Sequence, residues 1–493
     1  MANGREERNI VMFPFMAHGH LNPFMALARE LERKEGYTIT IVNTPLNIQR
    51  LKSSLPSQTN IRLAEIPLNG TKYGLPPDAE NTDTLSHEFM GCFLEASENL
   101  ISPFKNLLID ITRHDGRDPV CIISDMFLGW TVKVANELGI YHTVFIAGAG
   151  YSMAIYFSTS LNIHQSQTDD QEFLLPDFPE ASKIQKSRLG IDLKFTDGTN
   201  SWWRFRSHQF SLCLCSDAIL LNTIEGLGDI GVKYFNRKMG GKPIWMIGPT
   251  CSYNQEKRGE KLSSKTDSCC EWLDLHPPAS VLYVSFGSYS NILPSQMMEL
   301  ALGLEASNKP FIWVIRPPYG FNITEEFRAE WLPLGFEERI NEKNQGLLVH
   351  KWAPQQEILS HKSTGAFLSH CGWNSVLESL SQGVPIIGWP LAGEQCFNSQ
   401  MLENEVGVCI EVARGVDSAT VKHDEVARLI KVVLGKTEKG EEMRKKAYQM
   451  KEKMEDALRE GGLEGSSIKA INDFLGTATS IKKSSLPSDP SLP

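Results

Sequence analysis

The chain has 493 residues, of which 41% are hydrophobic and 22% are charged, and its formal net charge is −10. This balance is typical of a globular protein, and the negative charge disfavours binding of the whole molecule to nucleic acid or anionic lipid. At roughly 100 to 200 residues per domain, the length suggests about two to four domains. No run of about 18 apolar residues is present, so the sequence predicts no membrane-spanning helix.

The N-terminus and the cysteines indicate the compartment. The short apolar run near the N-terminus has no signal-peptide cleavage pattern behind it, so we interpret it as the first strand. The ten cysteines are scattered without the paired spacing of a zinc site. We therefore expect reduced thiols and a cytoplasmic protein.

Strands and helices alternate along the first half of the chain. Asn22 and Pro23 are suited to cap and begin a helix, which Gly36 ends. Asp125 closes a continuous apolar run. The pattern predicts strands over residues 10–15, 37–44, 120–125 and 142–148. Strand, helix and parallel strand in succession indicate a doubly wound α/β sheet.

The same alternation restarts in the second half, with strands expected over 280–288 and 311–316 and a helix over 294–308. We therefore expect two Rossmann-like doubly wound domains facing across a cleft. The predicted segments are an N-terminal domain over 1–250, a polar linker over 251–268, a C-terminal domain over 269–460, a C-terminal helix over 461–476 that can pack back on the N-terminal domain, and a disordered Ser- and Pro-rich tail over 477–493.

Residues 365–383 read as a strand, a tight turn and a helix. The unpaired N–H groups of a helix start, together with the helix dipole, form an anion site. His370 is expected at the strand end, and Asn374 and Ser375 at the helix start, where all three offer donors. A diphosphate is the natural ligand of such a site.

Glu378 in this region, and Trp352 before it, each allow more than one interpretation. Ser375 and Glu378 have the S-x-x-E spacing of a capping box, but the Glu378 carboxylate could instead bind a ribose diol. Trp352 could be a core residue or a platform for a base. Spacing alone favours the cap and the core.

Other nucleotide-binding signatures are missing. Gly148 and Gly150 lack the third glycine of the dinucleotide motif, and Ile430 stands where a P-loop would begin with glycine. The sequence also has no Asp-x-Asp pair to carry a metal on a nucleotide.

The segment from Trp352 to Gln395, which includes "HCGWNS", resembles the signature box of plant secondary-product glycosyltransferases, which are UDP-sugar-dependent enzymes with the GT-B fold. The similarity extends along nearly the whole chain. It implies an N-terminal acceptor-binding domain and a C-terminal UDP-sugar-binding domain. It also implies a metal-independent, inverting hexosyl transfer in which the UDP-sugar is a co-substrate, so that no cofactor is needed. We expect a monomer.

The resemblance also implies roles for individual residues. Trp352 would stack on the uracil, Gln355 would lie beside it, and Glu378 would take the ribose hydroxyls. The diphosphate would be held by Ser288, His370, Asn374 and Ser375, the sugar would lie near Trp373 and bond Glu394 and Gln395, and Ala353 and Gly372 complete the UDP-sugar-binding set. Many relatives have Asp at the position of Glu394. Gln395 resembles the glucose users, so UDP-glucose is the expected donor, with UDP-galactose, UDP-xylose or UDP-rhamnose as alternatives.

The stretch "AHGHLNP" carries two histidines, either of which could remove a proton from an acceptor hydroxyl. Spacing alone does not choose between them, and a structural role is open for both. The resemblance places the catalytic base at His20, three residues before Pro23, and its carboxylate partner at Asp125. It leaves His18 as a wall or supporting group.

The acceptor is expected to be a small lipophilic plant metabolite, such as a flavonoid, another phenolic, a terpenoid or a hormone. Apolar side chains that could line its pocket, or belong to the core, are Phe15, Met16, Phe89, Phe93, Met126, Phe127, Phe145, Tyr151, Trp202, Trp203 and Phe205. Two other functions stay open. One is a non-catalytic UDP-sugar-binding protein, and the other is a nicotinamide oxidoreductase, although the glycine fingerprint is missing.

Overall fold

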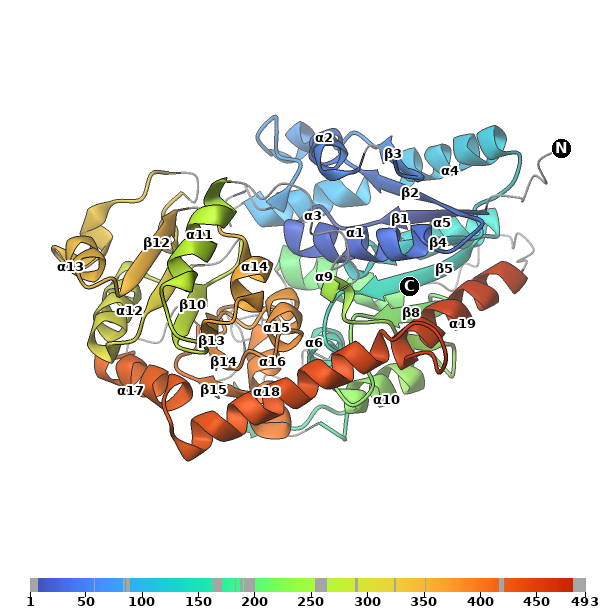
Figure 1. Ribbon diagram of the computed structural model, residues 1–493. Coiled ribbons are helices and arrows are strands. Elements are labelled where there is room, and N and C mark those ends of the chain that lie inside the picture. The colour runs from blue at the N-terminus through green and yellow to red at the C-terminus, as the bar shows by residue number, and fades with distance from the viewer. Residues whose placement is uncertain are drawn as a thin grey trace. The chain divides into compact units, whose positions relative to one another are not determined.

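The computed structural model describes residues 8–481 except 57, 83–84, 86–88, 163–170, 182, 187–188, 190–199, 253–263, 289–290, 323–324, 351 and 416–420. The chain forms two compact units (Figure 1). Unit 1 comprises Met1–Lys183, Thr196–Asn254 and Ala457–Pro493, and unit 2 comprises Ile184–Phe195 and Gln255–Asp456.

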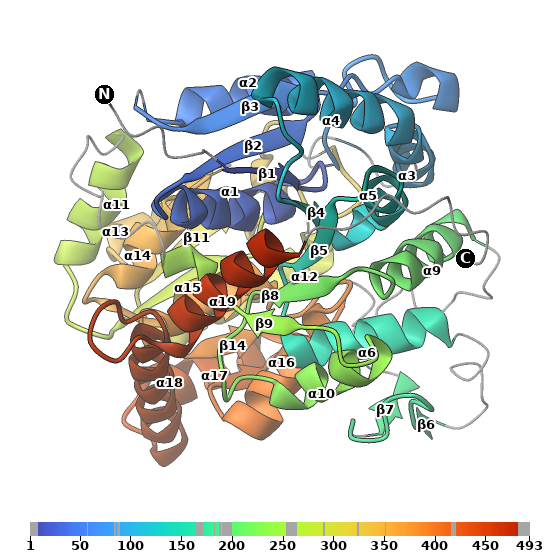
Figure 2. The ribbon, with the colours of Figure 1, turned by 90° about the vertical axis from the view of Figure 1, so that its right-hand side faces the viewer.

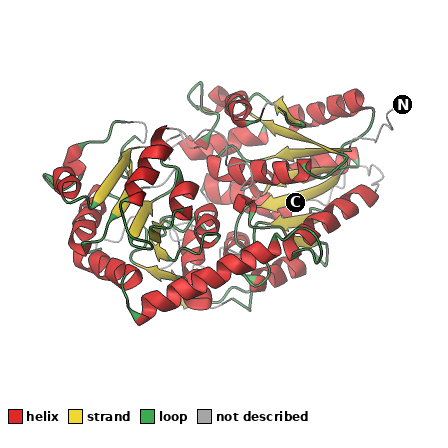
Figure 3. Ribbon diagram, viewed as in Figure 1, coloured by secondary structure: helices red, strands yellow, loops and turns green. Residues whose placement is uncertain are grey.

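Unit 1 is built on a seven-stranded sheet with the order β3-β2-β1-β4-β5-β8-β9, in which all the paired neighbours are parallel. Helices cover both faces (Figure 3), so the strands are almost continuously apolar. The order reverses between β1 and β4, and ligands of open α/β sheets bind at the carboxyl ends of strands at such a point. The strands are β1 (Arg8–Phe13), β2 (Tyr37–Asn43), β3 (Ile61–Glu65), β4 (Cys121–Asp125), β5 (Tyr141–Ile146), β8 (Ala218–Leu221) and β9 (Ile244–Met246).

The helices of unit 1 connect these parallel strands. Short β6 (Glu172–Phe173) lies outside the main sheet, as does β7 (Ile184–Gln185) of unit 2. The helices are α1 (His18–Glu32), α2 (Pro45–Ser54), α3 (Met90–Glu98), α4 (Ile101–Asp115), α5 (Thr131–Leu138), α6 (Gly150–Leu161), α9 (Ser201–Cys213), α10 (Asp229–Lys238) and α19 (Ser466–Ser480), with 3₁₀ turns η1 (Gly70–Tyr73), η4 (Met126–Leu128) and η6 (Thr250–Ser252).

Helix α1 begins earlier than the sequence predicted. Its N-cap is Ala17, whose carbonyl accepts from the backbone N–H groups of His20 and Leu21, and not Asn22. Pro23 therefore lies inside the helix, where it removes only the bond to the carbonyl of Gly19, an exposed residue that solvent can reach. As a result, both histidines lie in the first turn of α1, directly after the carboxyl end of β1.

Unit 2 repeats the architecture with a six-stranded parallel sheet in the order β12-β11-β10-β13-β14-β15. Its order reverses between β10 and β13. The strands are β10 (Val281–Ser285), β11 (Phe311–Ile315), β12 (Gly346–His350), β13 (Thr364–Ser369), β14 (Ile386–Gly388) and β15 (Cys409–Glu411). The helical elements are α11 (Ser264–Asp274), α12 (Pro294–Ser307), η8 (Ala329–Trp331), α13 (Phe336–Glu342), α14 (Gln355–Ser360), α15 (Trp373–Leu380), α16 (Gln395–Met401), the π-helix η9 (Leu402–Val406), α17 (His423–Leu434) and α18 (Glu438–Ala457).

The last helix, α19, belongs to the core of unit 1. It lies along β9 (Figure 2), and Phe474 packs edge-on against Trp245 with ring centroids 5.5 Å apart. Ile471 and Leu475 share one hydrophobic cluster with residues of β1 and β2. The helix continues to Ser480, so residues 477–480 are helical, and their assignment to a disordered tail was wrong. Residues 482–493 of that tail lie outside the described residues.

The expected linker coincides only in part with described structure. Residues 253–263 lie outside the described part of the chain, whereas α11 already begins at Ser264. The residues from Ser264 to Ser268, expected in the linker, are therefore helical. In the part of the chain that the structure describes, no helix is both long and apolar enough to cross a membrane.

Candidate active site

A short polar contact at the switch point of unit 1 joins His20 and Asp125. His20 Nδ1 lies 2.7 Å from Asp125 Oδ2, although the residues are 105 positions apart in sequence. Asp125 is 1% exposed, and its Oδ1 accepts from the backbone N–H of Phe127 at 3.0 Å. Because this carboxylate holds the proton on Nδ1, Nε2 of a neutral imidazole carries the lone pair that can accept a proton.

Aromatic rings surround this pair. The imidazole of His20 lies 5.7 Å from the ring centroid of Phe15 and 5.3 Å from that of Phe127. Phe93 of α3 packs edge-on against Phe15, and Trp202 of α9 lies 5.8 Å from Phe127. The His20 side chain is still 22% exposed, so a flat apolar acceptor can approach it beside these rings.

The other residues proposed from the sequence to line the acceptor pocket are buried or half-buried. Phe145 packs against Phe24 in the core of unit 1, and Tyr151 packs against Phe178. Three further candidates are buried, namely Met16, Met126 and Phe205, and two are half-buried, namely Phe89 and Trp203. His18 is half-buried at the first position of α1.

In unit 2 the turn from β13 into α15 has the predicted form. Gly372 is the N-cap of α15 and contributes no side-chain cap, so Asn374 and Ser375 lie in the first turn. The His370 ring is packed against two glycines. A Cβ on Gly372 would lie 2.4 Å from His370 Nε2, and one on Gly287 would lie 2.7 Å from the same atom. Gly287 also has a positive φ of 80°.

His370 is a neutral group in this setting. Burial of the ring, and secondarily the charge of Arg316, lower its pKa from 6.5 to about 4. Its Nδ1 is buried with no hydrogen-bond partner in the described part of the chain. A buried nitrogen without a partner is costly, and an anionic ligand at the start of α15 is a suitable partner for such a ring.

Glu378 is held by amide side chains and forms no capping box. Gln355 Nε2 donates to Glu378 Oε2 at 2.7 Å, and Gln356 Nε2 donates to Glu378 Oε1 at 3.0 Å. Gln355 also donates to Ser375 Oγ at 3.0 Å. The capping reading was wrong because the N-cap of α15 is Gly372, which places Ser375 inside the helix instead of at its cap.

Trp352 is 57% exposed, so the core reading of this residue was also wrong. It follows β12, and its backbone N–H donates to the carbonyl of His350 at 3.0 Å. The next residue, Ala353, is buried, as is Trp373. A large exposed indole at the carboxyl end of a parallel strand is suited to stack on a planar ligand.

The remaining residues predicted to bind the sugar and the diphosphate also belong to unit 2. Gln395 Oε1 accepts from the backbone N–H groups of Leu391 and Ala392 at 2.9 and 3.0 Å, which turns its amide nitrogen away from this loop. Glu394 is half-buried at the N-cap of α16. Ser288 is exposed directly after Gly287.

Three residues that support the site in unit 2 were not identified from the sequence. Gly287 holds the His370 ring, Gln356 holds Glu378, and Tyr283 donates its hydroxyl to Gln355 Oε1 at 3.3 Å. The motif "FGS" was a usable signal for Gly287. The roles of Gln356 and Tyr283 depend on partners 22 and 72 positions away, which local spacing does not reveal.

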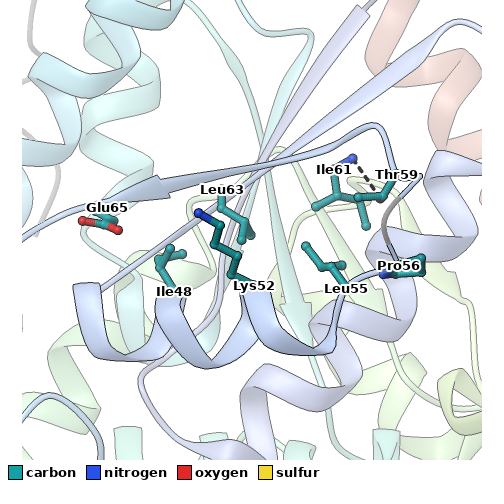
Figure 4. A pocket seen from close by; sticks show the side chains of 8 residues that line it. All are labelled: Ile48, Lys52, Leu55, Pro56, Thr59, Ile61, Leu63 and Glu65. Carbon is teal, nitrogen blue, oxygen red and sulfur yellow. Dashed lines mark hydrogen bonds between the residues drawn. The ribbon is translucent and has the colours of Figure 1, made fainter.

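A separate open pocket of about 440 Å³ lies between α2 and β3 of unit 1 (Figure 4). None of its lining residues belongs to the predicted site; they are Ile48, Lys52, Leu55, Pro56, Thr59, Ile61, Leu63 and Glu65. Among the described residues, no group of three or more His, Cys, Asp or Glu side chains could hold a metal ion.

Known proteins are similar to this chain in sequence and in fold. Residues 265–446 match the family described as UDP-glucoronosyl and UDP-glucosyl transferase. UDP-glycosyltransferase 92A1 of Arabidopsis thaliana is 44% identical over 476 residues, which cover 95% of this chain and 96% of the relative. Crocetin glucosyltransferase 3 of Crocus sativus is 41% identical over 479 residues, which cover 94% and 98%.

Among solved structures, Medicago truncatula UGT71G1 complexed with UDP-glucose is similar with a TM-score of 0.80 at 26% identity, covering 97% of this chain and 100% of that chain. The expected α/β architecture, with a doubly wound parallel sheet in each unit, is thereby confirmed as GT-B. With identities above 40% over almost the whole length, the chain belongs to the family of plant UDP-dependent glycosyltransferases.

Proposed function

We propose that this glycosyltransferase moves glucose from UDP-glucose, with inversion at the anomeric carbon, to a hydroxyl of a small lipophilic plant metabolite. The observation that carries the proposal is the pair formed by His20 and the buried Asp125 at the switch point of unit 1. Family membership sets aside the nicotinamide oxidoreductase alternative.

The proton transfer follows from the geometry of this pair. A neutral hydroxyl is a weak nucleophile, and His20 Nε2 takes its proton as the oxygen attacks the anomeric carbon. Asp125 keeps the ring in the required tautomer and stabilises the imidazolium that forms. A positioned general base of this kind contributes roughly 10²- to 10⁴-fold in rate.

The departing UDP gains negative charge on its diphosphate. We place this charge at the start of α15, where Asn374, Ser375 and the N–H groups of the first turn gather beside His370. The neutral His370 ring acts there as a hydrogen-bond donor. These groups supply the stabilisation that a metal ion would otherwise provide, so we propose a metal-independent reaction with the UDP-sugar as co-substrate and no resident cofactor.

The donor assignment rests on Gln395 and on the relatives. Crocetin glucosyltransferase 3 is named for glucosyl transfer, and the similar Medicago structure holds UDP-glucose. The Gln395 amide nitrogen can donate to a sugar hydroxyl, because its oxygen is occupied by two backbone N–H groups. UDP-galactose, UDP-xylose and UDP-rhamnose are the alternatives, and a donor swap in one assay separates them.

The proposed setting is a cytoplasmic monomer. The compartment is supported by the ten cysteines, all within the described residues, which form no disulfide bonds. The acceptor is proposed to be a flavonoid, another phenolic, a terpenoid or a hormone, because aromatic rings flank His20. An acceptor screen with UDP-glucose, read by product mass, identifies the class.

The decisive experiment is His20→Ala. We expect transfer to a hydroxyl acceptor to be lost while UDP binding, measured by calorimetry, is retained, because UDP is held by unit 2. The matched control is His423→Ala. This change also removes a histidine that contacts a carboxylate, since His423 Nδ1 lies 2.8 Å from an oxygen of Glu299, but neither residue belongs to the predicted catalytic or UDP-sugar-binding set. Near-normal activity of His20→Ala would overturn the base assignment.

A further inference from the structure

Three buried asparagines form a hydrogen-bonded group at the carboxyl end of β2 and the start of α2. Asn43, Asn47 and Asn81 are 0%, 1% and 3% exposed. Asn81 Nδ2 donates to Asn47 Oδ1 at 2.9 Å, and Asn47 Nδ2 donates to Asn43 Oδ1 at 2.8 Å. Asn47 Nδ2 also lies 3.0 Å from the carbonyl oxygen of Glu80. We call these three residues the asparagine relay.

The relay holds the segment that connects β1 to α1. Asn43 Nδ2 donates to the carbonyl of Pro14 at 2.9 Å. At the other end of the relay, the backbone N–H of Thr82, directly after Asn81, donates to the carbonyl of Met16 at 3.0 Å. Two carbonyls of this short segment are therefore fixed, one from β2 and one from the loop over residues 80–82.

The same segment positions His20. The N–H of Ala17 donates to the carbonyl of Phe15. The carbonyl of Ala17, the N-cap of α1, accepts from the N–H of His20 in the first turn of the helix. Asp125 is fixed independently, by β4 and by its bond with Phe127. A shift of the segment would therefore move the imidazole relative to its carboxylate partner.

Packing alone gives no reason for three buried amides here. Buried polar groups are tolerated only when they are hydrogen-bonded, and apolar side chains of similar size fill space without that requirement. A satisfied polar network instead fixes one arrangement of the backbone groups that it joins. In this protein the relay side chains bond the carbonyls of Pro14 and Glu80, and the N–H of Thr82, two residues after Glu80, in turn bonds the carbonyl of Met16.

We propose that the asparagine relay is a positioning device for the catalytic base, in which Asn43, Asn47 and Asn81 set the place of His20 by fixing the backbone of residues 14–17. The inference rests on the proposed role of His20. It adds positioning residues for the transfer that none of the sequence motifs indicated.

The test compares alanine variants of two buried asparagines in unit 1, Asn47 of α2 and Asn9 of β1. For Asn47→Ala we expect kcat to fall about 10- to 100-fold, as for a misplacement on the order of 1 Å, with KM for UDP-glucose unchanged. The control is Asn9→Ala. Asn9 is also buried and bonded, to Thr40 and Asp115, but it lies at the amino end of β1. It should lower the melting temperature and leave kcat unchanged.

A second readout separates positioning from general destabilisation. Two phenols that the wild type accepts are compared, one ionised at the assay pH, such as 4-nitrophenol, and one protonated, such as 4-methylphenol. The ionised phenol needs no base, so the loss in Asn47→Ala and in His20→Ala should be much smaller with it. Equal losses for both phenols, or a wild-type kcat in the relay variant, would overturn the proposal.

A second variant covers the case in which Asn47→Ala does not fold. Asn43→Asp keeps the size of the side chain and an oxygen for the N–H of Thr44. It replaces the amide donor to Pro14 with a carboxylate oxygen, which repels that carbonyl and adds a buried charge. It should show the same selective loss with the protonated phenol, and a wild-type kcat would again count against the relay. An active His20→Ala would instead refute the proposed function itself, so the two failures are distinguishable.

Discussion

Replacing Gly372 with alanine tests whether the position of the His370 ring matters for transfer. Gly372 has a φ of −61°, which alanine adopts easily, so the backbone is not strained by the change. The added Cβ would lie 2.4 Å from His370 Nε2, whereas ordinary contacts begin at 3.4 Å. The ring must therefore retreat by about 1 Å, unless the turn itself opens by the same amount.

This displacement has a calculable effect on the diphosphate contact. A hydrogen bond of about 2.8 Å would lengthen to about 3.8 Å, which is beyond bonding distance. Hydrogen bonds to charged groups contribute about 1.5–3 kcal/mol. Since about 1.4 kcal/mol corresponds to a factor of ten, kcat/KM should fall roughly 10- to 150-fold.

The assay is a double-mutant cycle with His370→Ala, measured as initial rates of UDP release at saturating acceptor. If Gly372 acts through His370, the alanine at 372 should have little further effect once the imidazole is gone. Gly476→Ala in α19 is the control, because a Cβ there meets no atom within 4 Å. A wild-type kcat/KM in Gly372→Ala, or an equal loss in both backgrounds, would refute the reasoning.

Three further outcomes are expected. Trp352→Ala should weaken UDP binding, measured by calorimetry, without lowering the melting temperature, because the indole is 57% exposed. His370→Gln should flatten the pH dependence of urea unfolding: the lowered pKa of about 4 makes the wild type lose stability as pH falls from about 6.5 to about 4, by up to about 3 kcal/mol, and an unchanged slope in the variant would contradict the shift. Adding EDTA should leave the transfer rate intact, and strong inhibition would contradict a metal-independent mechanism.

Local pattern located the central strands of each sheet but missed the outer strands β3, β8, β9, β12, β14 and β15 and misplaced the starts of helices. Apolar runs located β4 and β13 to within a residue, because buried parallel strands are continuously apolar. The N-cap of α1 is Ala17, five residues before the predicted cap Asn22, and an alanine offers no capping side chain for a sequence rule to detect. The same limit applies to α15. Its N-cap is Gly372, which has no side chain to detect, so the S-x-x-E spacing of Ser375 and Glu378 was taken for a capping box.

The site was predictable where topology or family resemblance supplied the long-range information. Strand ends at a switch point bring His20 and Asp125 to one edge, but only the resemblance distinguished His20 from His18. The exposure of Trp352 and the amide partners of Glu378 depend on packing between loops that are distant in sequence. Composition and periodicity contain no record of such contacts.

The place of α19 has a consequence for how this protein is made. Ile471, Phe474, Leu475 and Ala478 complete the cluster that also contains the first strand of the chain. A ribosome synthesises them after the whole of unit 2, so unit 1 lacks part of its interior until unit 2 has been made. Unit 2 has no such dependence, and we expect it to reach its native state first during translation. A gene truncated before residue 466 should therefore yield a product whose N-terminal half is readily degraded by proteases.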